Sequence, residues 1–311
     1  MFHVFIDGAS GTTGLRLEAR LSGRKDIQLI RIDEAHRKDP ERKRALMNAS
    51  DVTLLCLPDD AAKESAALCD DPDTVVIDTS TAHRTSSDWT YGFPELSDDQ
   101  RNQIRSAKRI TNPGCHAIGF ISITAPLVQA GILPNDYPVS CFSLTGYSGG
   151  GKKMIADYEN DKSREMEAPR LYGLSQSHKH LPEMQLYSGL TAPPVFTPII
   201  SDYYAGMATS ISLDRRLIPD LSVKTVRDCL KTHYDGAAVI RVLSPEDTGF
   251  PAMLSANRMA GKDSMVICVN GNDDRVLVSS VFDNLGKGAS GSAVQNMNLA
   301  LGLEETASLE L

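Results

Sequence analysis

The chain has 311 residues, 41% of them hydrophobic and 23% charged, and its formal net charge is −8. This length predicts one large domain or two moderate domains, each able to bury a core. The negative charge and the lack of a long lysine or arginine run argue against a nucleic-acid partner. No apolar run reaches the roughly 18 residues that span a bilayer, and no signal-peptide pattern opens the chain, so we expect a cytoplasmic protein with no membrane partner.

Four short apolar runs, at residues 2–6, 27–32, 52–57 and 75–77, are separated by helical stretches. Short runs of branched residues at this spacing are typical of buried parallel strands joined by crossover helices. The first 110 residues or so therefore predict an α/β domain of the Rossmann type.

The turn after the first run reads DGASGTTG over residues 7–14, between an expected strand and an expected helix. Its G-x-x-G-x-x-G spacing differs from the commoner G-x-G-x-x-G. The context still suits a dinucleotide pyrophosphate held by backbone N–H groups, although a glycine turn can also serve tight packing alone. We expect the cofactor to contact Gly8, Ser10, Gly11, Thr12, Thr13 and Gly14.

The choice between NAD and NADP depends on charges after the second run. Arg31 would favour a 2′-phosphate and Asp33 a free 2′-hydroxyl, while Arg37 and Lys38 add positive charge, so NADP(H) is favoured. The basic residues of positions 37–44 alternate with acids, which predicts a solvated helix face.

From residue 112 the pattern changes. A turn at 112–115 precedes an apolar helical stretch at 117–130, and strand candidates follow at 139–145, 195–200, 208–213, 239–243, 265–269 and 276–281. A last helix candidate, 291–303, could pack back on the first domain. We therefore expect a dinucleotide-binding domain of residues 1–114 plus 287–311 and an α+β domain of residues 115–286.

Cys115 follows Asn-Pro-Gly and opens a helix, where free N–H groups and the helix dipole stabilise a thiolate. The six cysteines lie far apart with no C-x-x-C pair, which indicates reduced thiols and no metal site. Cys56, inside an apolar strand, reads as a core residue, whereas Cys115 reads as a nucleophile.

The sequence HKHLPE at 178–183 offers a general acid or base, either His178 or His180, with Glu183 as an orienting partner. A surface histidine pair is the alternative, and a metal site would need a third ligand. The loop SGGGKK at 148–153 suits an anion such as a substrate phosphate, or it is a glycine hinge. Arg84, after the fourth strand, could clamp a phosphate or carboxylate, or form a surface ion pair.

A G-A-S-G-x-x-G turn, an Asn-Pro-Gly-Cys turn and a His-x-His-x-Pro-Glu stretch, in that order, resemble the N-acetyl-gamma-glutamyl-phosphate reductase family. The resemblance covers nearly the whole chain and includes YGFPEL at 91–96 and DNLGKGASG at 283–291. The chain is similar to the shorter subgroup. It departs from the longer members in being compact, in its Ser-Gly-Gly-Gly-Lys loop, where they tend to have Ser-Gly-Ala-Gly, and in His116, where an aromatic residue is usual.

The resemblance implies a semialdehyde-dehydrogenase-like fold and reduction of N-acetyl-gamma-glutamyl phosphate by NADPH, in arginine biosynthesis. The Cys115 thiolate would displace phosphate to form a thioester, and the hydride would give the 5-semialdehyde. His180, placed directly before x-Pro-Glu, would handle the proton, with His178 as the fallback. Ser80 and Asn284 would lie near the nicotinamide, and a homodimer or homotetramer would form through the second domain's sheet. The residues implied for substrate binding are Arg84, Asn112, Ser148, Gly149, Lys152 and Glu183.

Three alternatives remain open at this point. Aspartate-semialdehyde dehydrogenase shares the chemistry, but Gly114 and the HKHLPE run weigh against it. A lysine-pathway reductase of a carrier-bound acyl phosphate would need a basic docking surface. A redox regulator that binds NADP would use Cys115 as a switch and show no turnover.

Overall fold

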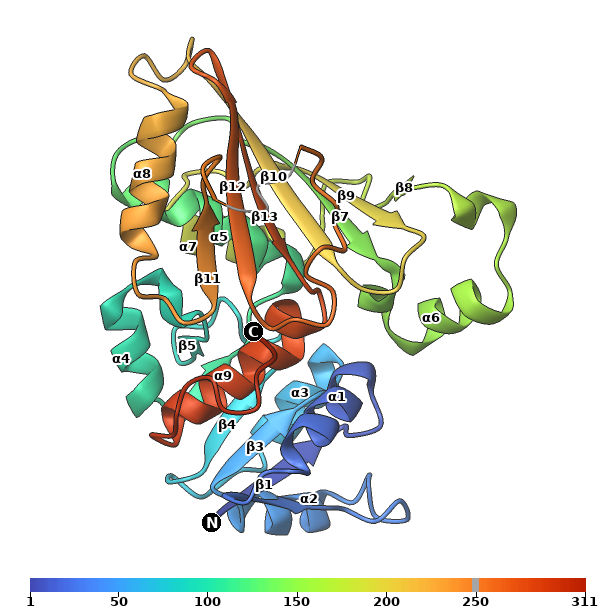
Figure 1. The fold of residues 1–311 in the computed structure, drawn as a ribbon. Coiled ribbons are helices and arrows are strands. Elements are labelled where there is room, and N and C mark those ends of the chain that lie inside the picture. The colour runs from blue at the N-terminus through green and yellow to red at the C-terminus, as the bar shows by residue number, and fades with distance from the viewer. Residues whose placement is uncertain (248–251) are drawn as a thin grey trace. The chain divides into compact units, whose positions relative to one another are not determined.

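The computed structural model describes residues 1–247 and 252–311 (Figure 1). The chain divides into two compact units: Met1–Gly114 with Ala289–Leu309, and Cys115–Gly288 with Glu310–Leu311. Within the described ranges, no helix has the length and apolar character that a membrane span requires.

The first unit contains a six-stranded sheet in which every strand pair is parallel, which confirms the predicted Rossmann-type fold class. In sheet order the strands are β2 (Ile27–Ile30), β1 (Phe2–Asp7), β3 (Val52–Leu55), β4 (Val75–Asp78), β6 (Arg109–Thr111) and β5 (Thr90–Tyr91). The four apolar runs of the sequence are β1 to β4.

Alternate residues of these strands enter two separate cores, because successive side chains point to opposite faces of a sheet. Val4 belongs to one core, which also holds residues of α1 (Thr12–Leu21), α4 (Asp98–Ser106) and α9 (Gly291–Ala300). Phe5 belongs to the other core, which holds residues of α2 (Pro40–Asn48). The remaining helices of this unit are α3 (Asp59–Ala66) and the short η1 (Pro94–Leu96).

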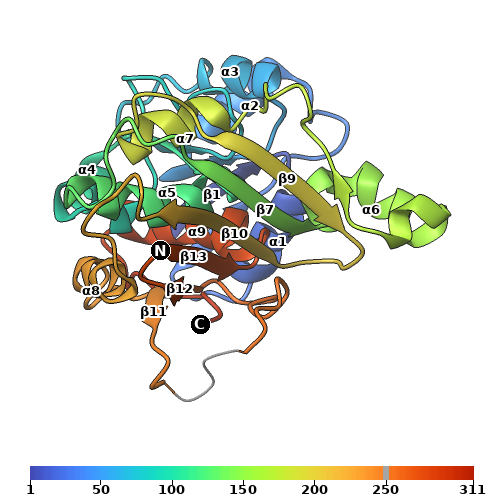
Figure 2. The ribbon, with the colours of Figure 1, turned by 90° about the horizontal axis from the view of Figure 1, so that it is seen from above.

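The second unit contains a seven-stranded mixed sheet, which confirms the predicted α+β class. In sheet order the strands are β11 (Ile240–Leu243), β12 (Met265–Asn272), β13 (Arg275–Phe282), β10 (Met207–Asp214), β7 (Ser140–Gly146), β9 (Val195–Ser201) and β8 (Arg170–Leu171). Figure 2 shows these strands in front of helix α5 (Cys115–Gln129), which contacts β10 and β13.

Helix α5 is buried over most of its length because its sequence, CHAIGFISITAPLVQ, is apolar around nearly the whole circumference. It ends before Gly131, whose φ of +69° closes the helix. The other helices of this unit are η2 (Tyr147–Gly150), α6 (Gly151–Asn160), η3 (Arg164–Glu167), α7 (Leu181–Ser188) and α8 (Val223–His233), and η4 (Gly286–Ser290) leads out of it.

Two expectations need correction. The helix expected at 291–303 ends at Ala300, because Gly302 adopts a left-handed φ of +66°. The solvated helix face expected at 37–44 is wrong at Lys43, whose side chain is 15% exposed and whose Nζ lies 2.8 Å from the Asp7 carboxylate. Arg37 and Lys38 precede α2 and lie in a turn.

Candidate active site

In the glycine turn of the first unit, the backbone packs so closely at Gly8 and Gly14 that neither position has room for a Cβ. Gly8 has a φ of +88°, and a Cβ there would lie 2.3 Å from the carbonyl oxygen of Cys56. A Cβ at Gly14 would lie 2.4 Å from the carbonyl oxygen of Gly8. The turn therefore folds back against its own backbone and brings the start of α1 beside the end of β3.

The start of α1 suits an anionic group. Gly11 is the N-cap, and in the described chain no side chain caps the first turn of α1. The Oγ1 of Thr12 is buried and has no hydrogen-bond partner among the described residues. Uncapped N–H groups and an unsatisfied hydroxyl fit the pyrophosphate of a dinucleotide. Thr13 is half-buried in the same first turn, and Ser10 is exposed.

Arg31, the residue expected to select the cofactor, follows β2 and is exposed. Its Nη2 lies 2.7 Å from the Glu18 carboxylate of α1. Asp33, the competing carboxylate, contacts the His36 ring at 2.6 Å, and this hydrogen bond lowers the pKa of Asp33. Both side chains lie at the surface after β2, and each is paired with another side chain.

A polar cluster lies at the carboxyl end of β4. The N–H and the hydroxyl of Ser80 both donate to the buried Asp78 carboxylate at 2.8 Å. The Nδ1 of His83 lies 2.7 Å from the same carboxylate, and its ring stacks on Trp89 at 4.1 Å. Asp78 thus fixes the backbone and side chain of Ser80, the residue that the resemblance links to the nicotinamide.

Arg84 and Asn112 make internal contacts in the first unit. The buried Arg84 donates to the carbonyl oxygens of Asn112 at 2.9 Å and Thr79 at 3.1 Å. The side-chain amide of Asn112 donates to the Ala289 carbonyl at 3.0 Å. Both residues, expected at the substrate, therefore brace the turn that precedes Cys115.

Cys115 is the first residue of α5 and is half-buried. A Cβ at Gly288 would lie 3.0 Å from the Cβ of Cys115, which is closer than an ordinary van der Waals contact. Burial raises the pKa of the thiols of the other five cysteines, and that of Cys56 reaches about 12. Those five thiols stay protonated at neutral pH and are poor nucleophiles.

Three histidine rings meet in the second unit. The rings of His178 and His180 are 4.7 Å apart, and each lies 5.7 Å from the ring of His116. His180 is the N-cap of α7 and is buried, and its backbone N–H donates to the Nδ1 of His178 at 3.2 Å. Glu183 is buried in the first turn of α7. The structure thus brings the expected base and its fallback beside the residue that follows Cys115 in sequence.

His116 connects this cluster to the sheet. Its Nδ1 lies 2.7 Å from the Ser143 hydroxyl, and its Nε2 lies 2.6 Å from the Tyr172 hydroxyl. Ser143 in turn lies 2.7 Å from the Thr209 hydroxyl. Sequence reasoning missed Tyr172, Ser143 and Thr209, because no local pattern links residues so far apart in the chain. The one local signal was the histidine at 116 in place of an aromatic residue.

Asn284, expected at the nicotinamide, lies in this unit beside Ser148 and Gly149, which are expected at the phosphate. The side-chain amide of Asn284 donates to the Ser148 hydroxyl at 3.0 Å and accepts from the Gly206 N–H at 2.8 Å. A Cβ at Gly149 would lie 3.4 Å from the Asn284 amide nitrogen. Lys152, by contrast, is exposed on α6.

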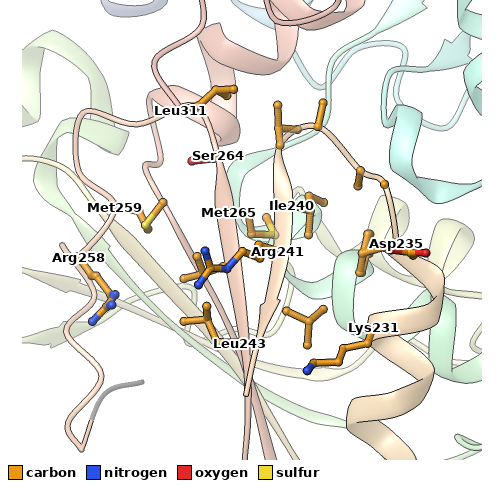
Figure 3. Close-up of a pocket in the computed structure, with 17 residues that line it drawn as sticks. Lys231, Asp235, Ile240, Arg241, Leu243, Arg258, Met259, Ser264, Met265 and Leu311 are labelled. Carbon is orange, nitrogen blue, oxygen red and sulfur yellow. The ribbon is translucent and has the colours of Figure 1, made fainter. Parts of the chain in front are cut away.

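A separate hollow of about 700 Å³ runs along β11 in the second unit (Figure 3). Its labelled lining includes the cationic side chains of Lys231, Arg241 and Arg258 and the carboxylate of Asp235. None of the expected site residues belongs to this lining in the described chain. The hollow is therefore separate from Cys115, His116, His178 and His180, which we call the cysteine-histidine cluster.

Comparisons with known proteins agree with this arrangement. Residues 3–106 match the semialdehyde dehydrogenase NAD binding domain, and residues 115–284 match the semialdehyde dehydrogenase dimerisation domain. The fold is similar to that of aspartate semialdehyde dehydrogenase II from Vibrio cholerae, with a TM-score of 0.71 at 18% identity over 97% of this chain and 98% of that one.

Two curated relatives are similar over nearly their full length. N-acetyl-gamma-glutamyl-phosphate reductase 2 of Pseudomonas putida is 45% identical, with 96% of each chain covered. N-acetyl-gamma-glutamyl-phosphate reductase of Burkholderia lata is 44% identical, with 98% of each chain covered. The chain belongs to the N-acetyl-gamma-glutamyl-phosphate reductase family, within the semialdehyde dehydrogenase fold.

Proposed function

We propose that the protein reduces N-acetyl-gamma-glutamyl phosphate to N-acetyl-L-glutamate 5-semialdehyde and phosphate, with NADPH as the reductant, in arginine biosynthesis. The observation that carries the proposal is Cys115 at the start of α5, followed directly by the residue whose ring meets His178 and His180. A helix start stabilises the thiolate that acyl transfer requires.

The chemistry falls to a few side chains. The Cys115 thiolate attacks the acyl carbon, the bond to phosphate breaks, and a thioester forms. Residues 8–14 would hold NADPH, which would supply the hydride for this carbonyl. His180 protonates the resulting oxyanion, and then removes that proton as the carbon–sulfur bond breaks, which returns the thiolate and releases the aldehyde. Because the thiolate must stay reduced, we also propose a cytoplasmic location.

The best-supported polar group for an anionic substrate consists of Ser148, Gly149 and Asn284. The Asn284 amide orients the Ser148 hydroxyl, and Gly149 leaves the backbone open to close approach. Lys152 and Glu183 extend this set by resemblance. Arg84 and Asn112 contribute by holding the turn before Cys115.

NADP is the proposed cofactor because the exposed Arg31 can meet a 2′-phosphate. Replacing Arg31 by alanine should raise the KM for NADP about tenfold, the size of one lost charged hydrogen bond, and leave the KM for NAD nearly unchanged. An equal rise for both cofactors would show that Arg31 does not read the phosphate.

The reaction is tested in reverse, by phosphate-dependent reduction of NADP at the absorbance of the reduced cofactor. Turnover with N-acetylglutamate 5-semialdehyde and none with aspartate semialdehyde is the expected result. Turnover of aspartate semialdehyde alone would assign the other substrate to the same chemistry. Cofactor binding without turnover of either aldehyde would favour a redox regulator.

We further propose that a second copy of the chain covers the outer face of the second unit's sheet. Phe142, Leu171 and Val195 are exposed there, on the face opposite α5, and residues 115–284 match a dimerisation domain. Replacing Phe142 by aspartate should convert a dimer or tetramer into smaller species in sedimentation velocity, whereas a monomeric wild-type protein would contradict the proposal.

A further inference from the structure

The turn after β4 is organised around one buried carboxylate. Asp78, the last residue of β4, is fully buried, and its oxygens lie 2.8 Å from the N–H nitrogen and the hydroxyl of Ser80 and 2.7 Å from the Nδ1 of His83. The His83 ring is also held from its face, because it stacks on Trp89 at 4.1 Å. A buried carboxylate is stable only when its oxygens accept hydrogen bonds such as these.

These contacts fix the direction of the Ser80 hydroxyl. A carboxylate offers acceptor sites only, so the hydroxyl proton points to Asp78 and is not available to a ligand. One of the two lone pairs of the Ser80 oxygen accepts from the Ala82 N–H at 3.1 Å. The second lone pair has no partner among the residues that the structure describes. The Ser80 hydroxyl can therefore accept one further hydrogen bond and donate none.

The backbone of the same turn adds no donor. The N–H of Ser80 donates to Asp78, and the N–H of Ala82 donates to Ser80. The N–H of Thr81 donates to the Asp59 carboxylate at 2.9 Å. Ser80 keeps 8% of its surface exposed, so the residue is not sealed inside the unit. A ligand that reaches Ser80 must itself supply an N–H or O–H group.

The place of this turn in the sheet indicates which part of a dinucleotide would meet it. Ligands of open α/β sheets lie at the carboxyl ends of the strands, with the pyrophosphate at the glycine turn after the first strand and the adenosine ribose beyond the second. Here β3 lies between β1 and β4, on the side of β1 opposite β2 (Figure 1). Two strand spacings, about 10 Å, separate β1 from β4, and a ribose and a ring extend that far. The nicotinamide half would then lie toward Ser80.

We propose that Asp78 is a positioning residue of the cofactor site, which holds the Ser80 hydroxyl as an acceptor for the carboxamide N–H of the nicotinamide. His83 supports Asp78 by donating to the same carboxylate oxygen. A carboxamide has an NH2 donor and a C=O acceptor, so a serine that only accepts selects the orientation that turns the NH2 toward β4. The inference rests on the proposed function, because it refines the NADP site that this function requires.

The first test compares NADP with its 3-acetylpyridine analogue, in which a methyl group replaces the carboxamide NH2, by isothermal titration calorimetry without substrate. The ratio of the two dissociation constants is the preference for the carboxamide, and the wild type should prefer NADP. Ser80→Ala should lower this preference about fivefold, the equivalent of one neutral hydrogen bond. Asp78→Asn should also lower it, because an amide NH2 can donate to the Ser80 oxygen and occupy the lone pair.

The matched control is Ser65→Ala. The buried Ser65 hydroxyl donates to the carboxylate of Asp7, the last residue of β1, at 2.7 Å, so this variant removes the same kind of hydrogen bond at another strand end. It should leave the preference for the carboxamide unchanged, even where it weakens both dinucleotides alike. An unchanged preference in Ser80→Ala, or an equal fall in Ser65→Ala, would overturn the proposal.

The second test uses the wild-type protein and so does not depend on a variant that folds. Two-bond proton–nitrogen NMR correlations of histidine-labelled protein, assigned with His83→Phe, report which ring nitrogen of His83 carries a proton. The proposal requires a proton on Nδ1, because the Asp78 carboxylate only accepts. A bare Nδ1 would place the proton on Asp78, leave the Ser80 hydroxyl without a fixed direction and overturn the proposal.

The two tests separate this inference from the function on which it rests. Binding of neither dinucleotide would overturn the proposed cofactor and this inference together. Binding of both with a preference that Ser80→Ala does not change would overturn this inference alone, since the proposed reaction requires NADP but not this orientation of Ser80.

Discussion

The glycine turn of the first unit is built from backbone groups, whereas the cysteine-histidine cluster of the second unit is built from side chains. The turn offers the backbone groups of seven consecutive residues, 8–14, for the proposed cofactor. The close contact between Gly8 and Cys56 leaves no room for a side chain at Gly8. The side chains of the cluster and of its hydrogen-bond partners come from β7, β10, α5, α7 and the segment after β8. A site made of backbone groups tolerates little change in backbone conformation. In a site made of side chains, one substitution should remove one chemical role and leave the others in place.

Substitutions should therefore have different effects at the two sites. A change in the turn should damage cofactor binding and stability together, because the same atoms serve both. A change in the cluster should damage catalysis and leave folding and cofactor binding intact.

The largest effect is expected for Cys115→Ala. Removal of the nucleophile should lower kcat by about 10⁴-fold or more, with the midpoint of thermal unfolding and the affinity for NADPH nearly unchanged. Steady-state kinetics and fluorescence titration of NADPH measure the two properties. Loss of NADPH binding together with activity would show that the cluster is not a separable catalytic site.

His180→Asn should come next, with kcat lowered by about 10²-fold or more, because general acid–base catalysis contributes on that scale. His178→Asn, which changes the ring 4.7 Å away, is the matched control and should cost less than about tenfold. If the two variants exchange their effects, His178 is the base, and if neither matters, proton transfer uses another group.

Gly8→Ala should break the turn. The φ of +88° and the 2.3 Å approach to the Cys56 carbonyl oxygen cannot be met by alanine without backbone movement, so a loss of about 2–4 kcal/mol in unfolding free energy is expected, with weakened NADPH binding. Gly23→Ala is the control, since nothing lies within 4 Å of a Cβ at that position. A stable Gly8→Ala protein that binds NADPH normally would contradict the backbone account.

The features that local sequence patterns determine could be predicted, and the contacts between residues distant in the chain could not. The strands at 2–6 and 52–57 and the turn at 7–14 follow from local patterns of apolar residues and glycines, and the structure contains them. Lys43 was misread because its partner, Asp7, lies 36 positions away and no local pattern reports it. Tyr172 was missed for the same reason. Arg84 stays a predicted substrate residue from its type and place, but its contacts with Thr79 and Asn112 depend on the folded turn and could not be predicted.

The smallest expected effect is a dependence of stability on pH, which tests whether the cluster excludes water from the His116 ring. Burial lowers the pKa of His116 to about 3 in the folded chain, from 6.5 for an exposed histidine. Below pH 6.5 the unfolded chain takes up a proton that the folded chain refuses until about pH 3, so the stability linked to a neutral His116 is lost as the pH falls through this window. Between pH 7.5 and 5 the unfolding free energy of the wild type should therefore fall by about 2 kcal/mol more than that of His116→Phe, in which the group is absent. Urea unfolding of both proteins across this range measures the difference. Parallel curves would mean that the ring is protonated or hydrated in the folded state.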